Sequence, residues 1–335
     1  MLNQSKQPID GAPEPRFDSE NEVGHLPVLA EETLSALDPK LGQVYVDLTA
    51  GRGGHAALVA QRLGATGRVI LFDVDAANLA YSAARVEAVS SIRPDTVHAS
   101  FASVARELER MGVVADLVLA DLGFASNQVD DPARGLSFMR EGPLDMRLDP
   151  AAGMTAAHLV NTTSERDLAD ILQRYGEEPL GRKIAAKIVA ARRDAPILHT
   201  VQLADLVRSA YGARAHTSRL HPATKTFQAL RIAVNDELSA LSAMLGSVST
   251  AARRVHDGRP SWLACGARVA IIGFHSLEDR LVKQCFVDMR KNDLAREITD
   301  GALVSSDSES AANPRSRSAK LRAAMVGHSK MPEKL

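Results

Sequence analysis

Two aspartates and a glycine-rich turn form the stretch of this chain that is best suited to chemistry. The turn is Gly51-Arg-Gly-Gly54, Asp47 precedes it by four residues, and Asp73 lies 22 residues after Gly51. Glycines let a backbone approach a ligand closely, and a following helix N-terminus offers unpaired N–H groups. An acid at the end of the next strand can accept hydrogen bonds from two ribose hydroxyls. The spacing therefore indicates half of a nucleoside-cofactor site.

The glycine turn alone does not identify the cofactor. Gly51, Gly53 and Ala56 match the G-x-G-x-x-G/A spacing, so an NAD enzyme fits, as does a tight βαβ turn without a ligand. Asp47, however, stands where a dinucleotide fold usually keeps an apolar strand end. A carboxylate there suits a positively charged cofactor, and S-adenosylmethionine (SAM) carries a sulfonium and an ammonium. The turn thus favours a methyltransferase.

Alternating strands and helices must position these residues. Segments 44–47, 68–72, 96–99 and 116–121 are rich in β-formers, and helical patterns over 55–63, 76–89 and 103–111 separate them. This alternation predicts an α/β fold with a parallel, doubly wound sheet. Ligands bind at the carboxyl ends of such strands. The residues that fall there are Asp47, Asp73, Phe101 and Asp121.

The pattern changes after about residue 130. No buried strand is evident before residue 231, and amphipathic helices are predicted over 168–175, 181–193 and 201–211. The apolar run Arg268–Phe274 then resumes the sheet. A helical block inserted into an α/β domain is the simplest interpretation.

Three further stretches could carry chemistry. Asp121 and Gln128 follow a predicted strand and can bond a ligand amine, although an Asx turn explains that segment equally well. Residues 135–147 mix apolar and charged side chains, which suits either a covering loop or a packed surface loop. His275-Ser276 invites a hydrolase interpretation, but no G-x-S-x-G elbow precedes it, and Ser276 more simply caps a helix.

Composition bounds the class of protein. The chain has 335 residues, 45% hydrophobic and 24% charged, which suffices for one large domain or two. Cys265 and Cys285 do not make a disulfide framework or a zinc site, which favours a reducing compartment. No apolar run approaches a membrane span, and the N-terminus lacks a signal-peptide core. We therefore expect a cytoplasmic protein without a membrane partner.

Positive charge is concentrated in the predicted helical block. The net charge of the chain is −1, yet residues 182–231 contain ten Lys and Arg against two acids, Asp194 and Asp205. A solvated helical face is the ordinary explanation of such a run. A local excess of this size in a nearly neutral protein also fits a surface that binds the phosphates of a nucleic acid.

Seven blocks of the sequence together resemble one family, the bacterial SAM-dependent 16S ribosomal RNA (cytosine-N4)-methyltransferases, or MraW/RsmH family. They are HLPVL (25–29), GRGGH (51–55), DLG (121–123), RGLSFMREGPLDMRLD (134–149), HPATKTFQALRIAVNDEL (221–238), GFHSLEDRLVK (273–283) and NPRSRSAKLR (313–322). They stand in family order over about 300 residues. The chain departs from the family in reading DLGFASNQ for DLGVSSPQ, in LTAGRGG after Asp47, and in a shortened, Ser-rich segment before residue 313.

The resemblance implies a Rossmann-like SAM-dependent methyltransferase sheet with an inserted all-helical substrate-recognition domain. It also implies N4-methylation of a cytidine in the decoding centre (P site) of 16S rRNA, within the small ribosomal subunit. No metal is implied. The oligomeric state stays open, with a homodimer as one option. The SAM contacts carried over by position are Gly53, Gly54, His55, Asp73, Phe101, Asp121 and Gln128, with Phe101 packing on adenine.

The resemblance also divides the chain. The expected parts are a disordered leader (1–24), a first part of the methyltransferase domain (25–130), a helical insert for RNA recognition (131–232), a second part of the methyltransferase domain (233–302) and a flexible basic tail (303–335).

The group that accepts the proton of the cytosine amine is not specified. The chain lacks the Asp/Asn-Pro-Pro-Tyr motif of many amino-methyltransferases, and Asp121, Asp145 and His275 are the candidates. Two alternative functions remain at this point. They are an NAD-dependent Rossmann oxidoreductase and a non-catalytic RNA-binding protein.

Overall fold

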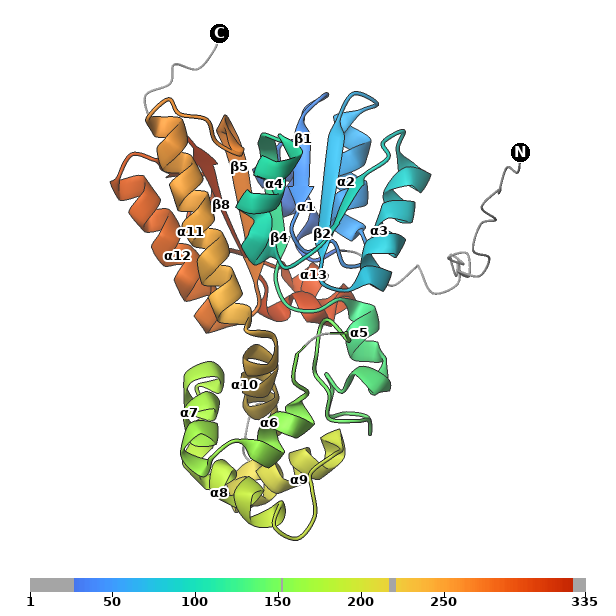
Figure 1. Cartoon of the computed structure of the whole chain (residues 1–335), viewed down its shortest axis with the longest axis vertical. Helices are drawn as coiled ribbons and strands as arrows, with labels where there is room; N and C mark the ends of the chain where they lie inside the picture. The colour runs from blue at the N-terminus through green and yellow to red at the C-terminus, as the bar shows by residue number, and fades with distance from the viewer. Residues whose placement is uncertain (1–26, 152, 217–220, 328–335) are drawn as a thin grey trace, which may run out of the picture.

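A part built on a β-sheet stands above a part built of helices, and helix α10 (Ala223–Asn235) joins the two (Figure 1). The computed structural model describes residues 27–151, 153–216 and 221–327. The expected leader, residues 1–24, lies outside the described residues. None of the helices in the described part of the chain has the length and apolar character needed to span a membrane.

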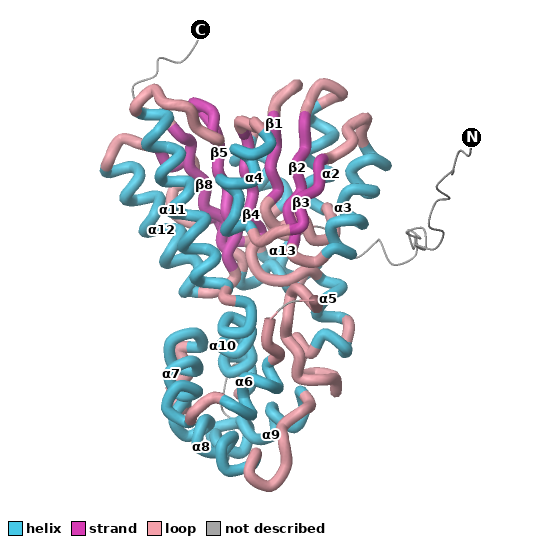
Figure 2. The backbone as a smooth tube through the Cα atoms, viewed as in Figure 1, coloured by secondary structure: helices cyan, strands magenta, loops and turns pink. Residues whose placement is uncertain are grey.

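The sheet has eight strands in the order β3-β2-β1-β4-β5-β8-β6, with β7 also paired to β8 (Figure 2). β1 to β5 are parallel, whereas β8 runs antiparallel to β5, β6 and β7. The predicted doubly wound parallel sheet is thus confirmed. The strands are β1 (Val44–Asp47), β2 (Arg68–Asp73), β3 (Asp95–His98), β4 (Ala115–Asp121), β5 (Leu263–Gly273), β6 (Ala295–Glu297), β7 (Leu303–Val304) and β8 (Lys320–Val326).

Helices cover both faces of the sheet, and alternate residues of each strand serve opposite faces. In β4, Leu117 and Leu119 pack with α1 to α3, whereas Val118 and Ala120 pack with α4, α11 and α12. Burial on both faces explains why β2 and β4 carry nearly continuous apolar runs. The helices are α1 (Ala30–Leu37), α2 (Gly54–Leu63), α3 (Ala76–Val89), α4 (Val104–Met111), α11 (Glu237–His256) and α12 (Ser276–Lys291).

The lower part is a block of helices with a hydrophobic core of its own, which includes Leu168, Ile184 and Val207. The three amphipathic helices predicted here are confirmed within a few residues. α10 continues through Asn235, so it crosses the boundary expected at residue 232. The helices are α6 (Ala156–Thr162), α7 (Glu165–Gly176), α8 (Gly181–Ala191), α9 (Thr200–Tyr211) and α10, and the short α5 (Ser126–Asp130) precedes them.

The prediction of a flexible basic tail after residue 303 is wrong for residues 303–326. This segment contains β7, α13 (Asp307–Ala312) and β8, and β8 lies inside the sheet between β5 and β6. Leu321 and Ala323 are buried, and Arg322 donates to Asp279 at 2.7 Å. The positive charge of this segment predicted a solvated tail, because the sequence does not show that Asp279 lies beside Arg322 in the folded chain and neutralises it.

Candidate active site

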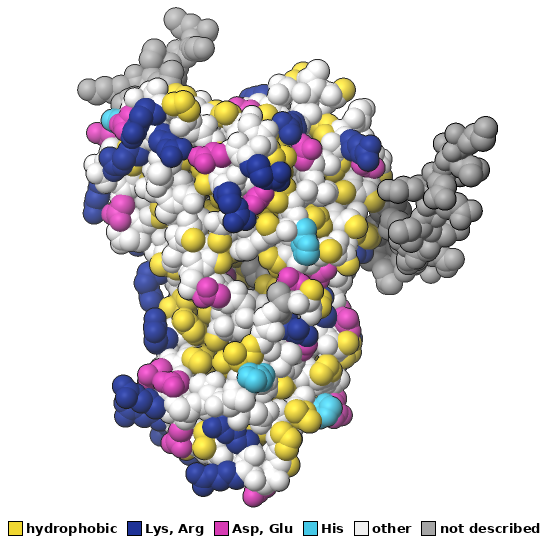
Figure 3. Space-filling model, viewed as in Figure 1, with side chains coloured by type: hydrophobic (Ala, Val, Ile, Leu, Met, Phe, Trp, Pro, Cys, Tyr) yellow, Lys and Arg dark blue, Asp and Glu magenta, His cyan; other side chains and the backbone are white. Residues whose placement is uncertain are grey.

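A cleft of about 810 Å³ lies between the carboxyl edge of the sheet and the helical block. Figure 3 shows the surface hollowed between the two parts. Gly53 and Asp145 are not among its lining residues. The predicted site residues that do line it are Gly54, His55, Asp73, Phe101, Asp121, Gln128 and His275.

The glycine turn forms one wall of this cleft. Gly51 donates its N–H to Asp73 Oδ2 at 2.8 Å, which ties the turn to the end of β2. Gly53 has a φ of +70°, and a Cβ at this position would lie 2.9 Å from the Cα of Ser82. Only glycine permits so close an approach of α2 to α3. Gly53 therefore shapes the turn by packing and does not face the cleft.

Asp73 ends β2 with both carboxylate oxygens hydrogen-bonded to the backbone. Oδ1 accepts from the N–H of Asp75 and Oδ2 from that of Gly51, each at 2.8 Å. Burial raises the pKa of Asp73 to about 6 even though these hydrogen bonds lower it. A carboxylate oxygen can accept more than one hydrogen bond. Asp73 can therefore still accept from the two hydroxyls of a ribose.

Two buried polar side chains, Asp47 and His55, and the partly exposed Asp121 meet where the strand order reverses between β1 and β4. Asp47 ends β1, and its two oxygens accept from Tyr45 Oη at 3.0 Å and from Thr49 N–H at 3.1 Å. Asp121 ends β4, and its buried Oδ1 has no hydrogen-bond partner among the described residues. His55 Nε2 is also buried without a partner there, and it lies 3.8 Å from Asp121 Oδ2. Two unsatisfied acceptors thus lie close together in residues that line the cleft.

Burial and like charges shift the pKa values at this junction. Burial raises the pKa of Asp121 to about 8, and the charges of Asp47 and Glu278 add to the rise. Burial also raises the pKa of Asp47 to about 6 and lowers that of His55 to about 4, so His55 is neutral near pH 7. In the described chain, Asp121 has no Lys or Arg partner. The junction therefore fits a ligand that brings positive charge and N–H donors, and SAM carries both.

Gln128 is buried at the cleft wall, with its amide already engaged. Oε1 accepts from the N–H of Ala125 at 2.9 Å, and Nε2 donates to Asp75 Oδ2 at 3.0 Å. Arg134 donates to the same Asp75 oxygen at 2.8 Å. Burial alone would raise the pKa of Asp75, but Arg134 and Gln128 hold it below its usual value. Gln128 therefore anchors the segment after β4, and a ligand contact would use its remaining hydrogen or lone pair.

The structure does not bring Asp145 to the cleft. Arg147 Nε and Nη2 donate to its two oxygens at 2.8 Å each. Burial alone would raise the pKa of Asp145, but these hydrogen bonds lower it below its usual value. Arg147 and Asp149 line the cleft instead. Asp145 is therefore placed to hold Arg147 rather than a substrate amine.

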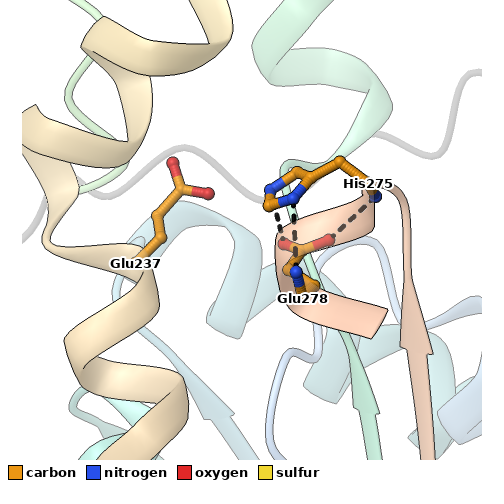
Figure 4. A group of neighbouring side chains, drawn as sticks. All are labelled: Glu237, His275 and Glu278. Atoms are coloured by element: carbon orange, nitrogen blue, oxygen red, sulfur yellow. Dashed lines mark hydrogen bonds and ion pairs between the residues drawn. The ribbon is translucent and has the colours of Figure 1, made fainter. Parts of the chain in front are cut away.

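His275 begins α12 beside Glu278 and faces Glu237 at the start of α11 (Figure 4). His275 Nδ1 accepts from the N–H of Glu278 at 3.4 Å, and Glu278 Oε2 accepts from the N–H of Phe274 at 2.8 Å. The helix cap is thus His275 and not Ser276 as predicted. The Ser276 hydroxyl instead donates to Glu177 at 2.9 Å.

Glu237, His275 and Glu278 offer three ligand atoms within 4.8 Å of one another, an arrangement that could hold a cation. Arg231 already supplies positive charge there, because its Nε and Nη2 donate to both Glu237 oxygens at 2.7 and 2.8 Å. Burial alone would raise the pKa of Glu278, but His275 and Arg231 lower it. The Arg231 guanidinium also lies 4.9 Å from the centre of the Phe124 ring. We therefore assign no metal to this cluster.

Sequence reasoning missed several cleft residues. Arg231 and Glu237 belong to the block HPATKTFQALRIAVNDEL, and Arg315 belongs to NPRSRSAKLR. The resemblance to the family therefore pointed to these blocks, but it did not show which of their residues line the cleft. Arg315 donates to Asp130 at 2.9 Å, which holds the C-terminal segment against α5. The lining residues not predicted include Phe124, Arg231, Glu237, Phe274, Glu278, Asn313 and Arg315.

Comparison with known proteins places the chain among methylases. A family model described as the MraW methylase family matches residues 22–326. A protein of Geotalea uraniireducens (strain Rf4) named ribosomal RNA small subunit methyltransferase H is 42% identical over 316 residues, covering 90% of this chain and 97% of that protein. A protein of the same name from Anaeromyxobacter dehalogenans (strain 2CP-1) is 44% identical over 319 residues, covering 89% of this chain and 96% of that protein.

Proposed function

Because the chain belongs to the MraW methylase family and is a SAM-dependent methyltransferase, we propose that it methylates N4 of a cytidine in the decoding centre (P site) of 16S rRNA. The matched relatives are named for methylation of small-subunit ribosomal RNA, which supports the substrate class. The observation that carries the proposal is the pair of unpartnered acceptors, Asp121 Oδ1 and His55 Nε2, in two residues that line the cleft. They suit a site where a cationic cofactor meets an amine.

We assign the cofactor to the sheet side of the cleft. Bound SAM supplies the methyl group as an electrophilic sulfonium. Asp73 accepts from the ribose hydroxyls, since it stands at the end of β2 with acceptor capacity to spare. Phe101 lines the same wall and offers a ring for the adenine to pack on. Gly54 and His55 bring the N-terminus of α2 to the cofactor.

Asp121 is the group we assign to the target amine. The amine nitrogen forms its bond to the methyl carbon as the carbon–sulfur bond breaks, and one amine proton leaves. The nitrogen lone pair is delocalised into the ring, so holding the amine in line carries much of the rate advantage, on the order of 7–11 kcal/mol in favourable cases. A carboxylate that accepts from the amine also stabilises positive charge developing on nitrogen.

We assign the RNA to the helical block and the rim of the cleft. A cytidine within folded rRNA must be unstacked to be reached, and Phe124 and Phe274 of the cleft wall offer aromatic surface for it. Arg182 and Lys183 of α8 are exposed, and Figure 3 shows Lys and Arg side chains along one edge of the block. Arg192 differs, because it donates to the Val160 carbonyl at 2.5 Å and so supports the block itself.

The two alternative functions are disfavoured on separate grounds. Membership of a methylase family argues against an NAD-dependent oxidoreductase. A non-catalytic RNA-binding protein would have no use for buried acceptors without partners at the strand ends, since such groups lower stability.

Methyl transfer to small ribosomal subunits from cells that lack this protein tests the proposal. We expect the purified protein and SAM to add one methyl group to one cytidine, located by mass mapping of 16S rRNA fragments. Chromatography against N4-methylcytidine and 5-methylcytidine standards identifies the modified atom. Naked 16S rRNA, assayed in parallel, shows whether the assembled subunit is the substrate. Methylation of a different base or at carbon 5 would contradict the proposal.

A further inference from the structure

Asp121 is surrounded by ionisable groups from several elements. Asp47 and Tyr45 of β1, His55 of α2 and Glu278 of α12 face it. The groups one step further away are Asp73, which raises the pKa of Asp47, and Arg231 and His275, which lower the pKa of Glu278. Among the described residues, the groups whose charges act on Asp121 are the acids Asp47 and Glu278, and Arg231 of the same cleft is engaged by Glu237.

Nothing in the described chain stabilises a negative charge on Asp121 directly. Its backbone N–H donates to Thr49 Oγ1 at 2.6 Å, but Oδ1 of its carboxylate is buried and accepts no hydrogen bond from the described residues. His55 makes a hydrogen bond with the backbone of Val28 that favours its protonated form, yet burial keeps the ring neutral. His55 Nε2 therefore turns a lone pair toward Asp121 and cannot donate to it.

This environment makes the acid form of Asp121 the stable one in the free protein near neutral pH. Burial, with the charges of Asp47 and Glu278, raises the pKa of Asp121 to about 8. A carboxylic acid is a weak acceptor for an amine, so the free protein holds Asp121 in the wrong state for methyl transfer. Something that enters the site must remove the proton.

We propose that binding of SAM expels the proton of Asp121, and that binding of S-adenosylhomocysteine (SAH) does not. This inference rests on the proposed function, because an amine that Asp121 holds in line with the methyl group would bring the sulfonium of SAM near Asp121. SAM carries a sulfonium that SAH lacks. An opposite charge within about 4–6 Å lowers the pKa of a carboxyl group by about 1–3, which would bring the pKa of Asp121 from about 8 to about 5–7 and leave it at least half ionised at pH 7. The charge of the cofactor then decides the protonation state of its neighbour.

The dependence of Asp121 protonation on the charge of the cofactor also explains where the proton of the target amine goes. Before transfer Asp121 is a carboxylate, and the proton it lost has gone to solvent. As the nitrogen–carbon bond forms and the carbon–sulfur bond breaks, the sulfur becomes neutral and the amine becomes positive. One proton then passes from the methylated amine to Asp121, whose affinity for it has been restored. The products leave with Asp121 neutral, and the next SAM expels this proton in turn.

Calorimetry of cofactor binding in buffers of different ionisation enthalpy measures the released proton without turnover. We expect SAM to release about 0.4–0.9 of a proton at pH 7, the range that a pKa drop of about 1–3 gives, and SAH to release far less. The release should fall as the pH rises past about 8, where Asp121 is already ionised. SAM affinity should rise with pH by up to about tenfold per pH unit below that point and then level off. Asp47 and Asp73, with pKa values of about 6, contribute little to the proton release above pH 7, because they are already mostly ionised there.

Two variants separate Asp121 from its surroundings. Asp121→Asn should abolish the pH-dependent proton release and make the ratio of SAM to SAH affinity independent of pH. Asp47→Asn can keep the hydrogen bonds with Thr49 and Tyr45 while losing its charge. It should shift the midpoint of proton release to lower pH without changing its size. This second variant retains Asp121, so it tests the inference even where Asp121→Asn folds poorly.

The outcomes distinguish the inference from the proposed function. Equal proton release by SAM and SAH, or full release from Asp121→Asn, would overturn the inference while leaving methyl transfer standing. An unshifted midpoint in folded Asp47→Asn would overturn it as well. Failure of the wild-type protein to bind SAM at all would overturn the proposed function and the inference with it.

Discussion

Arg231 donates two hydrogen bonds to Glu237, at 2.7 and 2.8 Å, across the corner where α10 ends and α11 begins. The corner itself is Asp236, in the left-handed region with a φ of +51°. The side chains of Arg231 and Glu237 are 12% and 10% exposed, and both line the cleft. This ion pair therefore fixes the joint between the helical block and the sheet at the place where substrate and cofactor would meet.

Breaking the pair from one side should destabilise the protein strongly. Arg231→Met leaves Glu237 and Glu278 buried without their cation, and loss of one partner of a buried ion pair costs about 3–5 kcal/mol. Urea unfolding measures the change in the free energy of unfolding. The double variant Arg231→Met/Glu237→Leu should recover much of the loss, because it removes one unpaired acid. A cost below about 1 kcal/mol for Arg231→Met would show that the pair is not structural.

Asp73 should determine the affinity for the cofactor. Asp73→Ala removes an acceptor for the ribose hydroxyls, and we expect SAM binding to weaken by about 1.5–3 kcal/mol, the range for hydrogen bonds to charged groups. Calorimetry on the folded variant measures this. Asp95→Ala, at the start of neighbouring β3, is the control and should bind SAM normally. Unchanged SAM affinity in Asp73→Ala, or tighter binding of NAD than of SAM by the wild type, would refute the assignment.

Asp121 and Asp145 should differ sharply in turnover. Asp121→Asn keeps the shape of the side chain but leaves a weaker acceptor, so we expect single-turnover methylation with saturating SAM to fall about a hundredfold or more. Asp145→Asn should methylate nearly normally, because Asp145 is not among the residues that line the cleft and its carboxylate is engaged by Arg147. If Asp145→Asn were inactive and Asp121→Asn normal, the amine acceptor would belong to the loop and Asp121 to the cofactor alone.

The raised pKa of Asp121 predicts a stability that depends on pH. The folded protein binds the proton of Asp121 up to about pH 8, whereas an unfolded chain releases it near the ordinary value of 3.8. The contribution of Asp121 to the free energy of unfolding is therefore greatest below pH 3.8. It declines as the pH rises from 3.8 toward about 8. Without SAM, Asp121→Asn should have a higher Tm than the wild type at pH 8, with a smaller difference at pH 5. Equal Tm differences at both pH values would contradict the pKa shift.

The exposed cations of α8 should contribute to RNA affinity through phosphate contacts. Arg182→Gln and Lys183→Gln should each reduce the slope of log affinity against log salt by about 0.7–0.9, with SAM binding unchanged. Arg93→Gln, whose side chain is 94% exposed on the loop after α3, is the matched control and should leave the slope alone. An unchanged slope in the α8 variants would show that Arg182 and Lys183 face solvent and do not contact RNA phosphates.

Much of the site was predictable because it depends on short-range sequence. The run from Val44 to Asp73 specifies strand, turn, helix and strand by local periodicity, and the structure confirms β1, α2 and β2 there. A helical pattern was predicted over 76–89, and α3 has those bounds, with Asp75 as its N-cap. Parallel strands end at one edge, so Asp73 and Asp121 could be placed at a common cleft before any contact was known.

Only the tertiary structure decided which of the predicted site residues are already engaged by other side chains. Asp145 and Asp121 are both aspartates in family-like blocks, yet Arg147 engages one and nothing in the described chain engages the other. The pKa of Asp121 depends on its burial and then on the charges of Asp47 and Glu278, which come from distant parts of the sequence. β8 shows the same dependence, since its place in the sheet follows from β5, β6 and the pairing of Arg322 with Asp279. Local periodicity determines how a segment folds, whereas burial and electrostatic interaction act through space, and only the assembled chain determines which groups come together.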